Sequence, residues 1–203
     1  MNYLLFERTF KDFPIFSVKD IQKRYPDFDN RRLVEWKQKG YILKVRRGFY
    51  CFEERKKDER FQYFSANKIY SPSYVSFESA LAYYNIIPEG VFITISATTR
   101  NTANYETPIG SFTYKHLKPV LFFGYKLVQS EGGTIKIAEP EKVILDYFYM
   151  NKQNSIEEMK EMRFNEIQLK NIIDFERLKK YQKIFNSKII DKRIQLFKRV
   201  INA

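Results

Sequence analysis

Basic and amide side chains gather between positions 30 and 47, and their types suit contact with nucleic acid. A predicted helix carries Asn30, Arg31, Arg32, Lys37 and Gln38, and a predicted turn carries Arg46 and Arg47. Arg and Lys bind phosphates, whereas Arg also suits the edge of guanine, and Asn and Gln suit the edge of adenine. We therefore expect Asn30, Arg31 and Gln38 to contact bases. The arginine pair of the turn is expected to reach a neighbouring run of phosphates or the minor groove.

Local start and stop signals predict the two short helices that would position these residues. Ser17 is a capping residue with Asp20 as its acidic partner three positions on, and Pro26 ends this first helix. Asp29 or Asn30 is expected to cap the second helix. Its apolar stripe is predicted at Leu33, Val34 and Trp36.

A small hairpin is predicted directly after the second helix, which Gly40 ends. The strands are expected at positions 42–45 and 49–52, around a turn in which Gly48 accommodates a positive φ. A further short helix is predicted at positions 1–9. Two helices followed by a hairpin form the order of elements in a winged helix-turn-helix, so the segment 17–52 predicts that motif.

The net charge of +12 is concentrated at the two ends of the 203-residue chain. Positions 1–60 hold 16 basic and 10 acidic residues, positions 61–151 hold 7 of each, and positions 152–203 hold 13 and 7. Two basic ends could both contact phosphate, or one could face an acidic protein. At the N-terminal end the charge coincides with the predicted motif, which favours nucleic acid there.

The remainder of the chain predicts an α+β fold with a mostly antiparallel sheet and a helical C-terminal tail. Helices are predicted at 76–84, with Ser76 as cap, and from Pro140 to about Met150. Strands are predicted at 91–96, 112–117, 121–128 and 134–137, and the pattern is helical from position 155 onward. Connections that are too short for crossovers favour antiparallel pairing. We place the domain boundary in the charged run 53–60. It separates a winged helix-turn-helix domain, 1–56, from an α+β domain, 57–203.

Few residues in the chain suit catalysis, so we expect no enzymatic activity, no metal and no cofactor. His116 is the only histidine and falls in a predicted strand, and Cys51, the only cysteine, reads as a small buried hydrophobe. Gly132 and Gly133 read as a turn and not as a phosphate loop. Glu139, Glu141 and Asp146 are close in sequence, but Asp146 does not share a helix face well with Glu141. Without an apolar stretch of about 20 residues or a signal peptide, we expect a cytoplasmic protein with no membrane partner.

Several short motifs in a consistent order resemble the AbiEi antitoxins of type IV toxin–antitoxin and phage abortive-infection systems. They are Gly40-Tyr41-Ile42, Arg47-Gly48-Phe49-Tyr50, the stretch from Tyr74 to Leu81, Ile87-Pro88-Glu89, Thr98-Thr99-Arg100, the stretch from Glu106 to Gly110, and Ala138-Glu139-Pro140-Glu141-Lys142. The resemblance covers roughly positions 17–150, and the tail from 151 to 203 carries no matching motif.

The resemblance implies a repressor of its own operon that binds operator DNA through an N-terminal winged helix. It also implies that the second domain counteracts a nucleotidyltransferase-like toxin, AbiEii, encoded in the same operon, without needing a stable complex with it. Arg31, Arg32, Arg46 and Arg47 map onto the DNA-binding part by their positions in the motif. The resemblance assigns four residues to the antitoxin domain without individual roles: Thr99, Arg100, Glu139 and Lys142. Inverted-repeat operators in such systems imply two protomers for each site.

Two other classes of protein remain open from the residues alone. One is a transcriptional regulator whose second domain senses a ligand or forms oligomers. The other is a metal-dependent nuclease that a winged helix targets to DNA. A downstream gene for a nucleotidyltransferase-like protein would favour the antitoxin, and DNA cleavage that requires a divalent metal would favour the nuclease.

Overall fold

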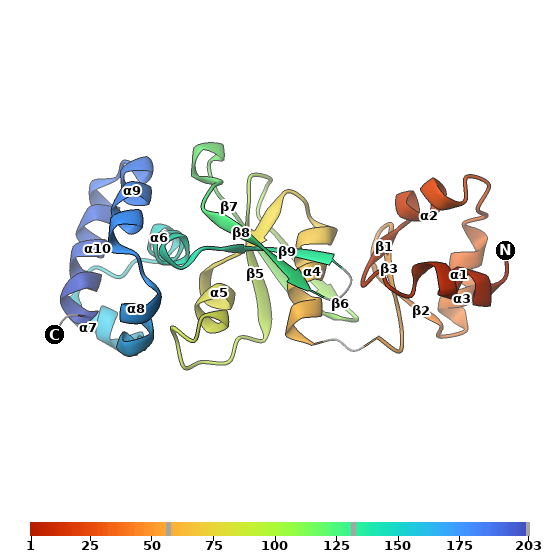
Figure 1. Ribbon diagram of the computed structural model, residues 1–203, viewed down its shortest axis with the longest axis horizontal. Helices are drawn as coiled ribbons and strands as arrows, with labels where there is room; N and C mark the ends of the chain where they lie inside the picture. Colours follow the sequence, from red (N-terminus) through yellow and green to blue (C-terminus); the bar gives the residue numbers. More distant parts are fainter. Residues whose placement is uncertain (56–57, 131–132, 202–203) are drawn as a thin grey trace.

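The computed structural model describes residues 1–55, 58–130 and 133–201, and it has three parts in a row (Figure 1). Small helices and a small sheet form one end, a six-stranded sheet forms the middle, and a group of helices forms the other end. The two termini lie at opposite ends of the long axis. The predicted α+β class, the mostly antiparallel sheet and the helical C-terminal tail are confirmed.

The N-terminal part contains the predicted helices and hairpin, with one additional short strand. Its elements are α1 (Tyr3–Phe10), β1 (Phe16–Ser17), α2 (Val18–Arg24), α3 (Arg31–Gln38), β2 (Ile42–Arg46) and β3 (Phe49–Phe52). The strands form an antiparallel sheet in the order β1-β3-β2. The capping box at the start of α2 is confirmed, since the Ser17 hydroxyl accepts from the Asp20 backbone N–H while the Asp20 carboxylate accepts from that of Ser17. Gly48 has φ +82° in the hairpin turn, as predicted.

Aromatic side chains fill the core of this part. Phe6 lies at its centre, with its ring centroid 4.6 Å from that of Trp36 and 5.3 Å from that of Phe16. Phe10 and Phe52 complete the cluster. Burying each of these rings contributes about 1.5–3 kcal/mol, so this core fixes α3 against α1 and the hairpin.

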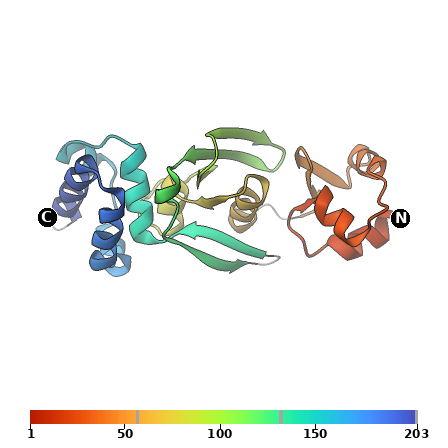
Figure 2. The same ribbon diagram turned by 90° about the horizontal axis from the view of Figure 1, so that it is seen from above.

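The middle part is built around α4 and a mixed sheet. Its elements are α4 (Glu59–Ile69), β4 (Ser73–Val75), α5 (Phe77–Tyr83), β5 (Ile93–Thr98), β6 (Ala103–Thr107), β7 (Gly110–His116), the 3-10 turn η1 (Pro119–Leu121), β8 (Tyr125–Ser130) and β9 (Gly133–Ala138). The strand order is β6-β7-β5-β4-β9-β8. Seen from above, the hairpins β6–β7 and β8–β9 lie on either side of α4 (Figure 2).

Two pairs in this sheet are parallel, which the sequence did not predict. They are β5 with β7 and β4 with β9. In each pair, at least one other element lies between the two strands along the chain. The short connections from which antiparallel pairing was predicted therefore do not join these strands. Strands β4 and β6 were also missed, and positions 121–124 are not a strand. The predicted turn at Gly132 and Gly133 lies partly outside the described residues.

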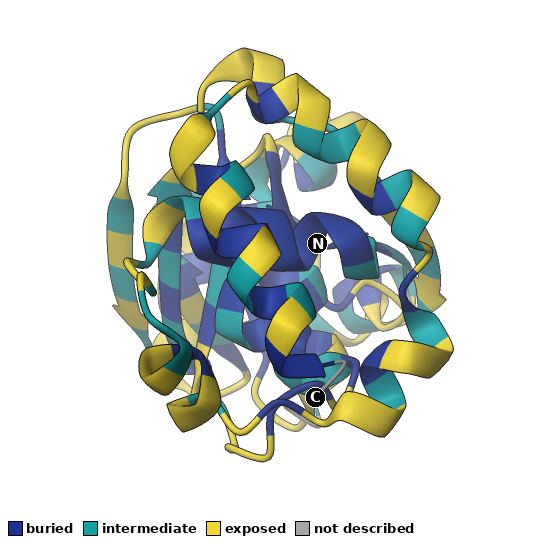
Figure 3. Ribbon diagram, turned by 90° about the vertical axis from the view of Figure 1, so that its left-hand side faces the viewer, coloured by how far each residue is buried: buried dark blue, intermediate teal, exposed yellow. Residues whose placement is uncertain are grey.

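Helix α6 (Pro140–Met150) separates the sheet from the remaining helices, and it begins and ends where predicted. Eight consecutive residues of α6, positions 141–148, are buried. They are covered on one side by α5 and Tyr74 of β4, and on the other by α9 (Phe175–Phe185) and α10 (Lys188–Ile201). Helices α7 (Ile156–Glu161) and α8 (Glu166–Ile172) pack against α10. Viewed onto this end, buried and exposed bands alternate along the outer helices (Figure 3), as amphipathic packing requires.

An apolar cluster joins the N-terminal part to the middle part. Val45 and Cys51 of the hairpin belong to the same buried cluster as Phe61 and Ile69 of α4 and Tyr114 of β7. The predicted boundary between positions 56 and 57 lies outside the described residues, and the division into two domains stays a prediction. Residues before and after that boundary nevertheless pack against each other in this apolar cluster.

An ion pair between Asp20 and Lys68 also joins the N-terminal part to the middle part. The Asp20 carboxylate lies 3.1 Å from the Lys68 ammonium of α4 and also accepts from the Ser17 hydroxyl at 2.7 Å. Burial alone would raise the pKa of Asp20, but these contacts outweigh it and the pKa is lowered. A carboxyl group with a lowered folded-state pKa stabilises the fold above its unfolded pKa, and this contribution is lost as the pH falls through the folded pKa.

We predict that Asp20→Asn lowers the free energy of unfolding at pH 7 by about 1 kcal/mol and has a smaller effect below about pH 4. Urea unfolding of both proteins at a series of pH values measures the difference. Asp27→Asn, at an exposed position, should give no such pH-dependent gap. A gap that stays constant from pH 7 to pH 3 would show that the Asp20 carboxylate has no stabilising role.

Candidate nucleic-acid interface

Helix α3 is held by its buried side and presents the opposite side to solvent. Leu33 and Trp36, three positions apart, are both buried. The Asp29 carboxylate accepts from the Arg31 backbone N–H at 3.0 Å, so Asp29 satisfies a donor at the start of the helix although Asn30 occupies the cap position. These contacts fix the rotation of α3 about its own axis.

The outward face of α3 carries two residues that were predicted to contact bases, Arg31 and Gln38, and one that was not, Val34. At 100° for each residue, Arg31, Val34 and Gln38 lie on one face, opposite Leu33 and Trp36. Val34 is 58% exposed, so its assignment to the apolar stripe was wrong. A helical projection centred on Leu33 and Trp36 would have found it, because Val34 lies between Arg31 and Gln38 on that face.

The other predicted residues of α3 surround this face. Asn30, Arg32 and Lys37 are exposed, Asn30 at the start of the helix and the other two along its flanks. The helix lies at the end of the molecule farthest from the C-terminal helices (Figure 1). All five predicted side chains of this helix are therefore accessible.

Two acidic residues partly neutralise the arginines of α3. Arg31 Nε lies 3.0 Å from Asp29, and Arg32 Nη1 lies 3.2 Å from Glu35. The hydrogen bond from the Arg31 side chain lowers the pKa of Asp29. Exposed pairs of this kind are worth about 0–1 kcal/mol, so phosphate groups can replace these carboxylates at small cost.

The two arginines of the hairpin turn have different environments. Arg47 is exposed beside Gly48, as predicted. Arg46 is half-buried: its Nη1 donates to the Ile69 carbonyl at 2.6 Å, and its guanidinium lies 4.2 Å from the centroid of the Tyr105 ring. The pairing of β2 with β3 is irregular between Lys44 and Arg46, so Arg46 faces the middle part as Val45 does, whereas Arg47 lies in the turn.

Thr99 and Arg100, assigned by resemblance to the second domain, follow directly after β5. Thr99 is half-buried. The Arg100 guanidinium lies 4.5 Å from the centroid of the Tyr70 ring, and its backbone carbonyl lies 2.9 Å from His116 Nδ1. Arg100 therefore lies near the N-terminal part and far from Glu139 and Lys142 along the sheet.

Glu139 and Lys142 lie at the start of α6. Glu139 occupies the N-cap position of the helix, but its side chain makes no capping hydrogen bond and instead accepts from the Tyr181 hydroxyl of α9. Lys142 is completely buried and pairs with Asp146, one turn further on in the same helix. The Lys142 ammonium also donates to the Tyr74 hydroxyl of β4 at 2.9 Å.

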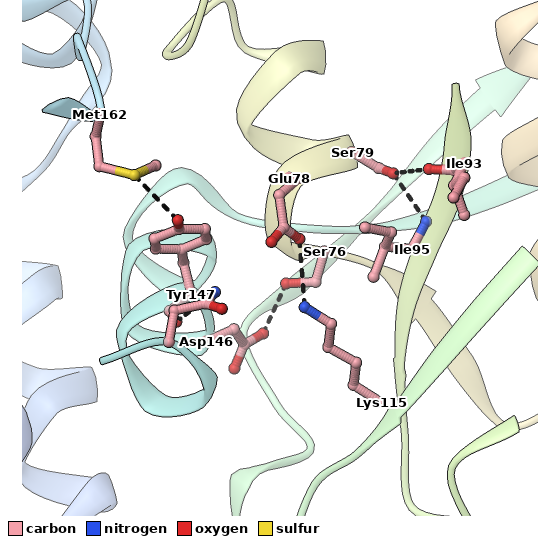
Figure 4. A network of polar contacts seen from close by, with 10 residues as sticks. Ser76, Glu78, Ser79, Ile93, Ile95, Lys115, Asp146, Tyr147 and Met162 are labelled. Atoms are coloured by element: carbon pink, nitrogen blue, oxygen red, sulfur yellow. Dashed lines mark hydrogen bonds and ion pairs between the residues drawn. The ribbon is translucent and has the colours of Figure 1, made fainter. Parts of the chain in front are cut away.

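Hydroxyl groups from the sheet and α5 complete the surroundings of Asp146. The Tyr74 hydroxyl donates to its carboxylate at 2.9 Å. The Ser76 hydroxyl also donates to it, at 2.8 Å, as Figure 4 shows. Ser76, predicted to cap α5, thus uses its hydroxyl to join α5 to α6. Burial raises the pKa of Asp146 and lowers that of Lys142, although their mutual attraction opposes both shifts.

This network is best understood as a structural link between α6 and the sheet. Each of its four side chains is at most 1% exposed, and buried charges of this kind require such partners. The sequence pointed to Lys142 only through a motif. The spacing of four positions between Lys142 and Asp146 was the signal that could have paired them.

A second basic surface covers the C-terminal helices at the other end of the molecule. Lys179 and Lys183 of α9 and Lys198 of α10 line an open groove of about 620 Å³ between the two helices. Because α3 lies at the opposite end (Figure 1), this surface is separate from the interface described above.

No protein-family model and no curated protein matches the sequence. Within residues 1–55, 58–130 and 133–201, no three His, Cys, Asp or Glu side chains lie close enough to hold a metal ion. None of the helices in the described ranges is long and apolar enough to cross a membrane.

We predict that Lys142→Met and Asp146→Asn each lower the free energy of unfolding by about 3–5 kcal/mol, because each leaves the other group buried without its partner. The double variant should lose much less than the sum of the two, as measured by urea unfolding. Lys118→Met, at an exposed position, is the control and should have almost no effect. Additive losses would contradict the coupling between the two side chains.

Proposed function

We propose that this protein is a DNA-binding autorepressor and an antitoxin that counteracts a nucleotidyltransferase-like toxin encoded in the same operon. In this proposal α2, α3, β2 and β3 form a winged helix-turn-helix that binds operator DNA. The single observation that carries it is the exposed face of α3, where Arg31, Val34 and Gln38 lie together.

Those three side chains suit the major groove. Arg31 can bind guanine with two hydrogen bonds, Gln38 can bind adenine in the same way, and Val34 can contact the methyl group of thymine. Arg32, Lys37 and Arg47, all exposed, would bind phosphates on either side. The DNA partner would be the operator upstream of the gene, with two protomers on an inverted repeat, in the cytoplasm.

The antitoxin half of the proposal rests on the sequence resemblance. Most motifs of the second domain lie in β4, α5, the end of β5 and the start of α6, and these elements share one buried cluster; the stretch from Glu106 to Gly110 lies at the turn between β6 and β7. The roles of Lys142 and Glu139 described above are structural, so the surface that opposes the toxin is expected elsewhere on the second domain.

We predict that Arg31→Ala and Gln38→Ala each weaken binding to the upstream DNA by about tenfold or more, because each removes contacts with a base. Binding to unrelated DNA should weaken much less. A gel-shift titration with both duplexes measures this difference. Lys118→Ala, which removes an exposed charge away from α3, is the matched control. Unchanged affinity in both α3 variants would refute the assignment of this helix.

The two activities should be separable in the full-length chain. We predict that the Arg31→Ala/Gln38→Ala double variant, expressed from an unrelated promoter, rescues cells from the adjacent toxin gene as well as the unchanged protein does. The reason is that the α3 face lies apart from that buried cluster of the second domain. Growth after induction of the toxin measures rescue. Loss of rescue in a folded variant would argue against this division of roles.

A further inference from the structure

Arg46 and Arg100, which the sequence assigned to two separate sites, meet at one aromatic ring. The Arg46 guanidinium lies 5.3 Å from the centroid of the Tyr70 ring, and that of Arg100 lies 4.5 Å from it. Tyr105 provides a second ring against Arg46 at 4.2 Å. Cationic groups at these distances are attracted to the faces of aromatic rings.

The rings that hold Arg46 are themselves fixed to the middle part. The Tyr70 hydroxyl donates to the Asn101 carbonyl at 2.9 Å, and its ring centroid lies 4.7 Å from that of Tyr114. Tyr114 is buried and donates to the Ala66 carbonyl in α4 at 2.7 Å. The site that accepts the Arg46 guanidinium therefore includes α4, β6 and β7.

Arg46 is the last residue of β2, directly before the hairpin turn that carries Arg47. Its hydrogen bond to the Ile69 carbonyl and its two ring contacts hold the hairpin against the end of α4. These contacts direct the guanidinium toward the middle part of the protein. Arg47 is the neighbouring charge that remains exposed.

We propose that Arg46 is a positioning residue that fixes the hairpin, and with it α3, to the middle part of the protein. The N-terminal part then meets DNA in one orientation, and Arg46 itself does not contact phosphate. The DNA-binding consequence rests on the proposed function, whereas the coupling between the two parts does not.

The first test measures affinity for the upstream DNA over a series of salt concentrations. A side chain that binds phosphate contributes about 0.9 to the slope of log K against log[salt]. Arg47→Ala should therefore reduce the slope by about one. Arg46→Ala should weaken binding by about tenfold and leave the slope unchanged. A reduced slope in Arg46→Ala, equal to that of Arg47→Ala, would overturn the proposal.

The second test needs no DNA and uses the single tryptophan, Trp36, which lies in the N-terminal part. During urea unfolding, Trp36 fluorescence follows this part, whereas far-UV ellipticity follows the whole chain. The two transitions should coincide in the unchanged protein and in Arg47→Ala. In Arg46→Ala and Tyr105→Leu the fluorescence transition should occur at lower urea concentration. Coincident transitions in both variants would overturn the proposal.

Conservative variants separate the ring contact from a general loss of stability. Tyr105→Phe keeps the ring and should behave as the unchanged protein does. Arg46→Lys keeps the charge but loses the planar group that stacks on the ring, and should resemble Arg46→Ala. If Arg47→Ala and the α3 variants leave DNA binding unchanged while the transitions separate as expected, the proposed function fails and the coupling stands.

Discussion

The apolar contact between the hairpin and α4 decides which basic side chains of the N-terminal part face solvent. Val45 and Cys51 pack into the same cluster as Phe61 and Ile69, so one face of the hairpin is committed to the middle part. Arg46 follows Val45 at the edge of that face and binds the end of α4. Arg47, one residue later, is left exposed with the outer face of α3.

Exposed basic side chains gather at the two ends of the molecule. The face with Arg31, Val34 and Gln38 lies at one end, and the lysines of α9 and α10 lie at the other. Between them, the buried network of Lys142, Asp146 and its hydroxyl partners fixes α6 to the sheet. The motif residues in the middle part therefore hold the fold together, and the candidate binding groups lie at the ends.

Local signals in the sequence predicted the elements well, and contacts between distant segments were not predictable in the same way. The Ser17 capping box and the start of α6 at Pro140 each depend on a few neighbouring residues. The parallel pair of β4 and β9, in which Val75 is the partner of Ile137, joins segments separated by several other elements. Arg46 and Arg47 are identical in type, so only the packing of the hairpin on α4 distinguishes them.

The central claim is that DNA binds to the outer face of α3 and to the exposed side of the hairpin turn. Titration of the isotope-labelled full chain with its own upstream duplex, followed by backbone amide NMR, tests this claim most directly. The claim predicts the largest shifts in α3 and at Arg47, with small shifts in α9 and α10. Shifts confined to the C-terminal helices, or no shifts at all, would contradict it.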